Sequence, residues 1–198
     1  ATMLVGAAFA TWFASAVCKK TSIGGLPEVF TALGGAGNYF FIPIVIALLM
    51  WLLADFLLKK TKFGRDVYSV GTNPKAAFIS GIHVKKTIFW MFMISGLYAA
   101  VESILLTARN QAGMSSLGST MFLNIVSAVV IGGTSVSGGF GGVRQTFLGA
   151  VFIVLINNAM NLIGVEWYTI MLIQGLLILL ATVIDFVVKN SRNRAKKG

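Results

Sequence analysis

Long apolar runs separated by short polar segments limit what this chain can fold into. A helix needs about 20 mostly apolar residues to cross the hydrocarbon core of a bilayer. Runs of roughly that length cover residues 40–58, 87–106, 147–163 and 168–188. Only 11% of the residues are charged, whereas a soluble domain carries about 25%. With shorter apolar runs at 3–17 and 122–137, the sequence predicts an all-α, polytopic transmembrane helical bundle of about five to six spans.

Basic residues are concentrated at the ends of the apolar runs. The formal net charge is +10, and seven of the sixteen Lys and Arg residues lie between Lys59 and Lys86, with five more between Lys189 and Lys197. Cytoplasmic loops of membrane proteins carry such an excess of positive charge. Four apolar runs separate the two basic clusters. If each run crosses the membrane, the even number of crossings places both clusters on the same side of it. We therefore expect the segment 66–86 and the basic tail 189–198 to be cytoplasmic.

The residues needed for several kinds of chemistry are missing from the sequence. One histidine (His83) and one cysteine (Cys18) are too few for a metal site or an intrachain disulfide. Neither a Gly-x-Ser-x-Gly string nor a Gly-x4-Gly-Lys-Ser/Thr string is present. The basic residues do not alternate with aromatic residues on a soluble face, as they do in nucleic-acid-binding proteins. We therefore expect no catalysis, ATP hydrolysis included, no metal or other cofactor, and no nucleic-acid partner.

The chain begins within an apolar run. Its first residue is Ala1 rather than Met, and neither a basic n-region nor a small-residue cleavage site follows. We therefore expect the C-terminal part of a longer protein, with residues 1–198 forming a single, partial membrane domain.

The one long polar interval between apolar runs is Asp66 to Lys86. Within it, Asn73 suits a helix N-cap, Pro74 suits the first helical position, and Gly81 suits a stop signal. The sequence predicts a helix of about two turns, too short to span a bilayer and suited to docking. The alternative is an ordinary interhelical loop with a short surface helix.

Three asparagines interrupt the run 147–163. Asn157 and Asn161 are four residues apart and Asn158 and Asn161 three apart, so on a helix they form one polar edge. Hydrogen bonds to neighbouring helices would satisfy these amides, and each such bond would stabilise the helix packing by about 1 kcal/mol. A polar lining for a hydroxylated solute is the other interpretation, since an amide both donates and accepts. The sequence leaves both open.

Glycines interrupt the run 122–137 at Gly132-Gly133-Thr134-Ser135, and the string Gly138-Gly139-x-Gly141-Gly142 follows. Broken helices occur in membranes where protein or water satisfies the freed backbone. We therefore expect that this run does not cross the membrane in one straight piece.

Few acidic residues lie in or near the apolar runs. Asp55 precedes Lys59 by one helical turn, which predicts an i,i+4 ion pair at the membrane edge rather than a proton carrier, and Asp185 with Lys189 repeats the arrangement. Glu102 is the one acid well within a run, where burial costs several kcal/mol unless the group is paired or protonated. Its role stays open between solute contact, an interhelical bond and an interfacial position.

Several of these segments resemble a known family. Ala76-Ala77 followed by Gly81 resembles the Ala-Ala-x3-Gly core of the coupling loop in ABC importer permeases, although Lys75 stands where a Glu is often found. The string from Val129 through Ser135 closely resembles the glycine-rich motif of the ribose-type sugar permeases, which belong to the branched-chain amino acid/ribose permease family. The string from Asn157 to Val165 is similar to another segment of that family, with Ala159 in place of a Gly. The resemblance covers Leu26 to Asp185.

The resemblance implies a subunit of an ATP-driven importer in the bacterial inner membrane, which passes a sugar or sugar-like solute by alternating access. Its partners would be an ATP-binding subunit, a second permease copy or homologue, an external solute-binding protein and membrane lipid. The residues implied for the coupling loop are Asn73, Pro74, Lys75, Ala76, Ala77, Ser80, Gly81 and Ile82. Those expected along the translocation pathway are Asn157, Asn158, Asn161, Gly132, Gly133, Thr134, Ser135 and Glu102.

Two other functions remain open from the sequence. An ion-coupled secondary transporter would use Glu102 as its coupling acid. A membrane scaffold without transport activity would use the asparagines only to join helices.

Overall fold

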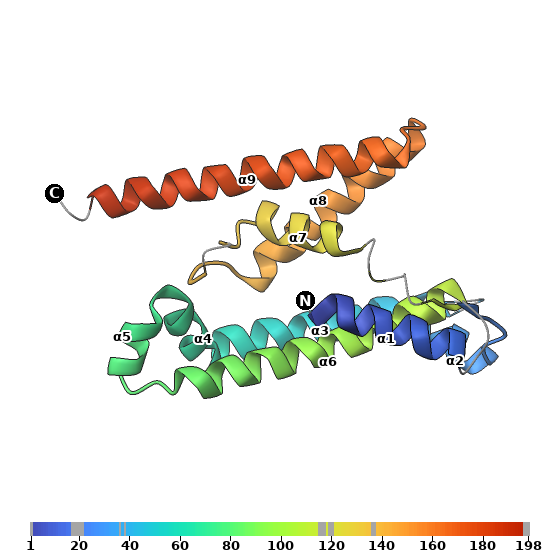
Figure 1. The fold of residues 1–198 in the computed structure, drawn as a ribbon, viewed down its shortest axis with the longest axis horizontal. Helices are drawn as coiled ribbons and strands as arrows, with labels where there is room; N and C mark the ends of the chain where they lie inside the picture. Colours follow the sequence, from blue (N-terminus) through green and yellow to red (C-terminus); the bar gives the residue numbers. More distant parts are fainter. Residues whose placement is uncertain are drawn as a thin grey trace. The chain divides into compact units, whose positions relative to one another are not determined.

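The computed structural model describes residues 2–16, 22–35, 37, 39–114, 118, 121–135 and 138–195, and these are almost entirely helical (Figure 1). The helices are α1 (Thr2–Ala16), α2 (Glu28–Leu33), α3 (Phe41–Lys60), α4 (Lys62–Thr72), α5 (Pro74–Ile79), α6 (Val84–Asn110), α7 (Met121–Ile131), α8 (Val143–Leu162) and α9 (Trp167–Ala195). The chain divides into two compact units, one of Ala1–Leu53 with Trp90–Thr120 and one of Ala54–Phe89 with Met121–Gly198.

The first unit contains α1, α2 and the greater part of α3 and α6. The Tyr98 hydroxyl of α6 donates to the Met50 carbonyl of α3 at 3.0 Å, so the two long helices are joined at mid-length. Two short strands, β1 (Ser22–Ile23) and β2 (Gly113–Met114), pair antiparallel. The sequence did not predict this pairing, because two-residue strands carry no periodic pattern.

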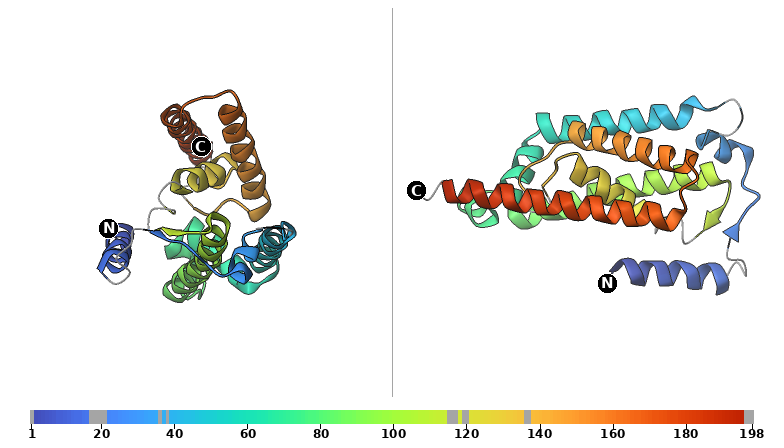
Figure 2. Two further views of the ribbon diagram at one scale, coloured as in Figure 1. Left: turned by 90° about the vertical axis from the view of Figure 1, so that its right-hand side faces the viewer. Right: turned by 90° about the horizontal axis from the view of Figure 1, so that it is seen from above.

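The second unit is built around α7, which packs against both α8 and α9 (Figures 1 and 2). Gly149 of α8 allows the closest approach, since a Cβ added there would lie 2.7 Å from the backbone nitrogen of Gly132. Ile153, Ala128 and Ser127 are buried beside this crossing. The glycines thus bring two helix backbones together, as small residues do in membrane helix pairs.

Three helices among the described residues are long and apolar enough to cross a membrane, namely α3, α6 and α8. Three shorter apolar helices accompany them, at Val5–Ala16, Met121–Ile131 and Tyr168–Leu180. The predicted number of five to six spans is therefore too high by this measure. In α7 the cause is clear: its 11 residues rise about 16 Å, roughly half of a bilayer core.

The interruption of the run 122–137 is confirmed. α7 ends at Ile131, and Gly133 follows with φ of 79°, a left-handed conformation that glycine adopts without strain. The apolar run therefore does not continue as one straight helix.

Helix α4 lies partly inside the interval that sequence analysis treated as a polar connector. Thr61 caps it, since its hydroxyl accepts from the Gly64 N–H at 3.2 Å. Phe63, Val67 and Val70 recur at a spacing of four and three residues, which places them on one helix face, and Val70 is buried. The signal for an amphipathic helix was present in the sequence but short.

Candidate functional site

Helix α5 begins as the sequence predicts. The Asn73 Oδ1 accepts from the backbone N–H groups of Lys75 and Ala76, at 3.0 and 3.2 Å, and Pro74 occupies the first turn. These bonds satisfy two of the N–H groups that a helix start leaves without partners. The predicted N-cap and two-turn helix are confirmed.

The end of α5 is equally well defined. Gly81 has φ of 83°, and the Ile82 N–H donates to the Ala77 carbonyl at 3.0 Å, so the chain turns sharply after Ser80. Ala77 is 4% exposed, and α5 packs against α4. The predicted stop at Gly81 is confirmed.

The outer side of α5 is apolar and open. Phe78 and Ile79 are 72% and 84% exposed. Beside them is a hollow of about 670 Å³, lined by Pro74, Lys75, Phe78, Ile79, His83, Val84, Lys85 and Lys86. Its lysines surround the apolar side chains. Such a surface can take a partner that offers an apolar patch bordered by acidic groups.

A cluster of three amides, one from each of α7, α8 and α9, lies at the centre of the second unit. The Gln174 Nε2 donates to the Asn124 Oδ1 at 2.8 Å and to the Asn157 Oδ1 at 2.6 Å. The Asn157 Nδ2 in turn donates to the Asn124 Oδ1 at 3.1 Å. We call Asn124, Asn157 and Gln174 the amide cluster. It links three helices by side-chain hydrogen bonds.

The three predicted pathway asparagines have different surroundings. Asn157 belongs to the amide cluster, whereas Asn158 is exposed. Asn161 is exposed as well, and its Nδ2 donates to the Asn157 carbonyl of its own helix at 2.8 Å. Asn124 and Gln174 are not among the residues predicted from the sequence, although each is a lone amide in an apolar run and Gln174 is 4% exposed. The pathway role of all three asparagines stays a prediction.

The glycine-rich segment folds back on itself. The Ser135 N–H donates to the Phe140 carbonyl at 3.0 Å, and the Thr134 and Thr146 hydroxyls lie 3.2 Å apart. A Cβ on Gly141 would lie 2.6 Å from the Thr134 methyl group, so only glycine fits there. Gly132, Gly133, Thr134 and Ser135 therefore form a tight turn between α7 and the start of α8.

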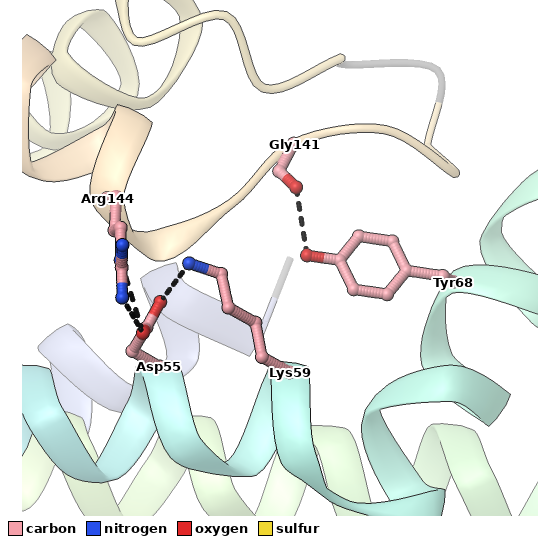
Figure 3. Close-up of polar contacts among 5 residues, drawn as sticks. All are labelled: Asp55, Lys59, Tyr68, Gly141 and Arg144. Atoms are coloured by element: carbon pink, nitrogen blue, oxygen red, sulfur yellow. Dashed lines mark hydrogen bonds and ion pairs between the residues drawn. The ribbon is translucent and has the colours of Figure 1, made fainter.

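Asp55 holds two cations near the end of α3 (Figure 3). Its Oδ1 lies 2.7 Å from the Lys59 Nζ, which confirms the predicted i,i+4 pair. Its Oδ2 lies 3.3 Å from an Arg144 nitrogen of α8, a contact between residues 89 positions apart that sequence analysis missed. Asp185 and Lys189 lie outside the residues whose side chains are described.

Glu102 lies apart from these groups. It is exposed on α6 and forms none of the ion pairs found among the described residues. It belongs to the first unit, whereas the other predicted pathway residues belong to the second. Its role stays a prediction.

Comparison with known proteins places these features in context. Residues 1–182 match the model of a family described as branched-chain amino acid transport system / permease component. The probable ABC transporter permease protein YphD of Escherichia coli (strain K12) is 35% identical over 172 residues, which cover 86% of this chain and 51% of the relative. The ribose import permease protein RbsC of Bacillus subtilis (strain 168) is 37% identical over 153 residues, covering 76% of this chain and 48% of the relative.

A third relative is named for a different solute. The xylose transport system permease protein XylH of Haemophilus influenzae is 38% identical over 143 residues, covering 72% of this chain and 38% of the relative. The chain thus spans about half of the first two relatives and less of the third. No solved structure matched the chain. The family match includes the N-terminal segment from residue 1, and the expectation of a C-terminal part of a longer chain stays a prediction.

Proposed function

Since the chain belongs to the branched-chain amino acid transport system / permease component family, we propose that it is part of the permease subunit of an ATP-driven ABC importer. It carries a sugar or a sugar-like solute across the bacterial inner membrane by alternating access. Relatives named as ribose and xylose permeases support a sugar, and both pentoses remain candidates. ATP is hydrolysed on a separate subunit.

The observation that carries the proposal is the geometry of α5. A short capped helix packs against α4, buries Ala77 and leaves Phe78 and Ile79 exposed. Exposed apolar side chains of this size on a short connector mark a docking surface. The neighbouring lysines Lys75, Lys85 and Lys86 agree with the predicted cytoplasmic location of this segment, since cytoplasmic loops are rich in positive charge. We infer that residues 66–86 form the coupling loop that the ATP-binding subunit holds, with Lys75 contributing charge where the family often has a carboxylate.

The remaining partners follow from the same assignment. A second permease copy or homologue completes the pathway, and an external solute-binding protein delivers the solute. The basic tail 189–198 lies in the cytoplasm with the coupling loop. Amide side chains such as Asn158 and Asn161 suit sugar hydroxyls, because each donates and accepts hydrogen bonds.

The test is a pull-down of the full-length permease with its ATP-binding subunit. Ile79→Asp places a charge on the apolar surface of α5 without touching the packing against α4, because Ile79 is 84% exposed. Val29→Asp is the matched control, since Val29 of α2 is 82% exposed and lies in the first unit. Loss of association and of complex ATPase activity in the first variant alone supports the proposal. Absence of association in the wild-type protein, or equal behaviour of both variants, contradicts it.

A further inference from the structure

Helices α4 and α5 are joined by hydrogen bonds at Asn73. Asn73 serves both, since its N–H donates to the Ser69 carbonyl at the end of α4 while its side chain caps α5. The Ala77 N–H donates to the Asn73 carbonyl at 3.0 Å, and Ala77 is buried. A displacement of α5 therefore displaces the last turn of α4.

The last turn of α4 touches the glycine-rich segment through backbone atoms. A Cβ added to Gly71 would lie 2.8 Å from the Gly139 nitrogen, and one added to Gly139 would lie 2.8 Å from the Thr72 Cα. Gly139 also has φ of 80°, which disfavours any side chain. The backbones of Gly71 and Thr72 thus lie against Gly139, together with the Thr72 hydroxyl, and this close contact resists compression.

A second link joins α4 to the start of α8. The Tyr68 hydroxyl donates to the Gly141 carbonyl at 2.8 Å, across 73 positions of sequence (Figure 3). Gly141 lies two residues before Val143, where α8 begins. A hydrogen bond resists separation, whereas the glycine contact resists only compression. Together the two contacts hold the α8 start to α4 in both directions.

Helix α8 carries this connection toward the predicted pathway. It is a continuous helix of 20 residues that includes Asn157 of the amide cluster, Asn158 and Asn161. A helix moves as a rigid element over this length, so a shift at its start reaches those amides.

We propose that the contact of Tyr68, Gly71 and Thr72 with Gly139 and Gly141 transmits movement of the coupling helix α5 to α8. Tyr68 is a positioning residue in this device, because it holds the start of α8 and touches no solute. The inference rests on the proposed function, which supplies the movement of α5.

The experiment uses the full-length permease assembled with its ATP-binding subunit in lipid nanodiscs, with Cys18 and every other native cysteine replaced by Ser. A single reporter cysteine, Asn158→Cys or Asn161→Cys, is labelled with a maleimide in the presence and absence of a non-hydrolysable ATP analogue. Tyr68→Phe is the test variant. Tyr98→Phe is its matched control, since the Tyr98 hydroxyl also donates to a backbone carbonyl, at 3.0 Å, but within the first unit.

A second pair of variants tests the contact between Gly71 and Gly139. Gly71→Ala forces a Cβ against Gly139, whereas Gly96→Ala on α6 meets nothing within 4 Å. We expect ATP to change the labelling rate in the wild-type protein and in both controls. In Tyr68→Phe the ATP-dependent change falls about two- to tenfold, the range expected from one hydrogen bond. In Gly71→Ala it falls as well, because the added Cβ displaces Gly139. Both variants retain pull-down of the ATP-binding subunit.

Three results would overturn the inference. Labelling that does not respond to ATP in an assembled wild-type complex would show that α8 does not move. Equal effects of Tyr68→Phe and Tyr98→Phe would show a general loss of stability. Wild-type responses in both test variants would show that the contact transmits nothing. A wild-type permease that fails to bind the ATP-binding subunit instead contradicts the proposed function, and the pull-down separates that failure from the others.

Discussion

The amide cluster offers the sharpest test of how the second unit is held together. Replacing Gln174 by Ala removes the hydrogen bonds to Asn124 and Asn157, at 2.8 and 2.6 Å. Hydrogen bonds between membrane helices average about 0.6 kcal/mol and reach about 1.7 kcal/mol, so two of them contribute roughly 1–3 kcal/mol. Gln174 is 4% exposed, and the space left by its side chain adds to the loss. We expect Gln174→Ala to lower the free energy of unfolding by about 2–3 kcal/mol.

The assay is denaturant-induced unfolding of the purified full-length permease in mixed micelles, followed by far-ultraviolet circular dichroism. Gln174→Leu fills most of the volume without the hydrogen bonds, and so separates the cavity from the lost bonds. Asn161→Ala is the control, because Asn161 is exposed and bonds only to a carbonyl of its own helix. It should change the free energy of unfolding by less than about 0.5 kcal/mol.

Equal free energies of unfolding for Gln174→Ala and Asn161→Ala would contradict this prediction. If stability is unchanged but the preference between ribose and xylose shifts, the cluster lines the pathway instead of joining helices. That result would favour the solute interpretation of Asn157 over the structural one.

Three further predictions concern single side chains. Gly149→Ala should lower the melting temperature, because overpacking against the α7 backbone costs about 1–3 kcal/mol and outweighs the gain of about 1 kcal/mol in helix propensity. Gly175→Ala should not lower it, because a Cβ at Gly175 meets nothing within 4 Å. Equal melting temperatures of the two variants would contradict the close approach of α8 to α7. Arg144→Gln should leave the melting temperature nearly unchanged, because Asp55 keeps its closer cation, Lys59, and the Arg144 side chain is 67% exposed. A large decrease would make Arg144 the main partner. Glu102→Gln should leave uptake of labelled ribose or xylose dependent on ATP, whereas a loss of dependence on an ion gradient would favour a secondary transporter.

The local features were predictable because their causes lie within a few residues. The span of α3 follows from a continuous apolar run, which the structure places at Phe41–Lys60 where the sequence predicts 40–58. The start and end of α5 follow from Asn73, Pro74 and Gly81, since capping and left-handed turns depend on adjacent backbone groups. The pair of Asp55 and Lys59 follows from helix periodicity.

Shorter elements were harder to predict. Helix α4 has only three apolar positions on its buried face, and the glycine run shortens α7 to 11 residues. A hydropathy pattern indicates that a segment is apolar, but the position of the helix end decides whether it reaches across a membrane. Among the described residues, the number of helices long and apolar enough to span a membrane is therefore lower than the sequence predicts.

Composition and local patterns are enough to indicate a helical membrane protein with a short capped helix on a basic connector. Apolar length, charge clusters and capping residues each act over one or a few helical turns. Which polar groups meet depends instead on the arrangement of the helices. Gln174 meets Asn124 across 50 positions and Tyr68 meets Gly141 across 73. Such contacts depend on how helices pack, and the free energy of packing is shared among many residues that no local string contains.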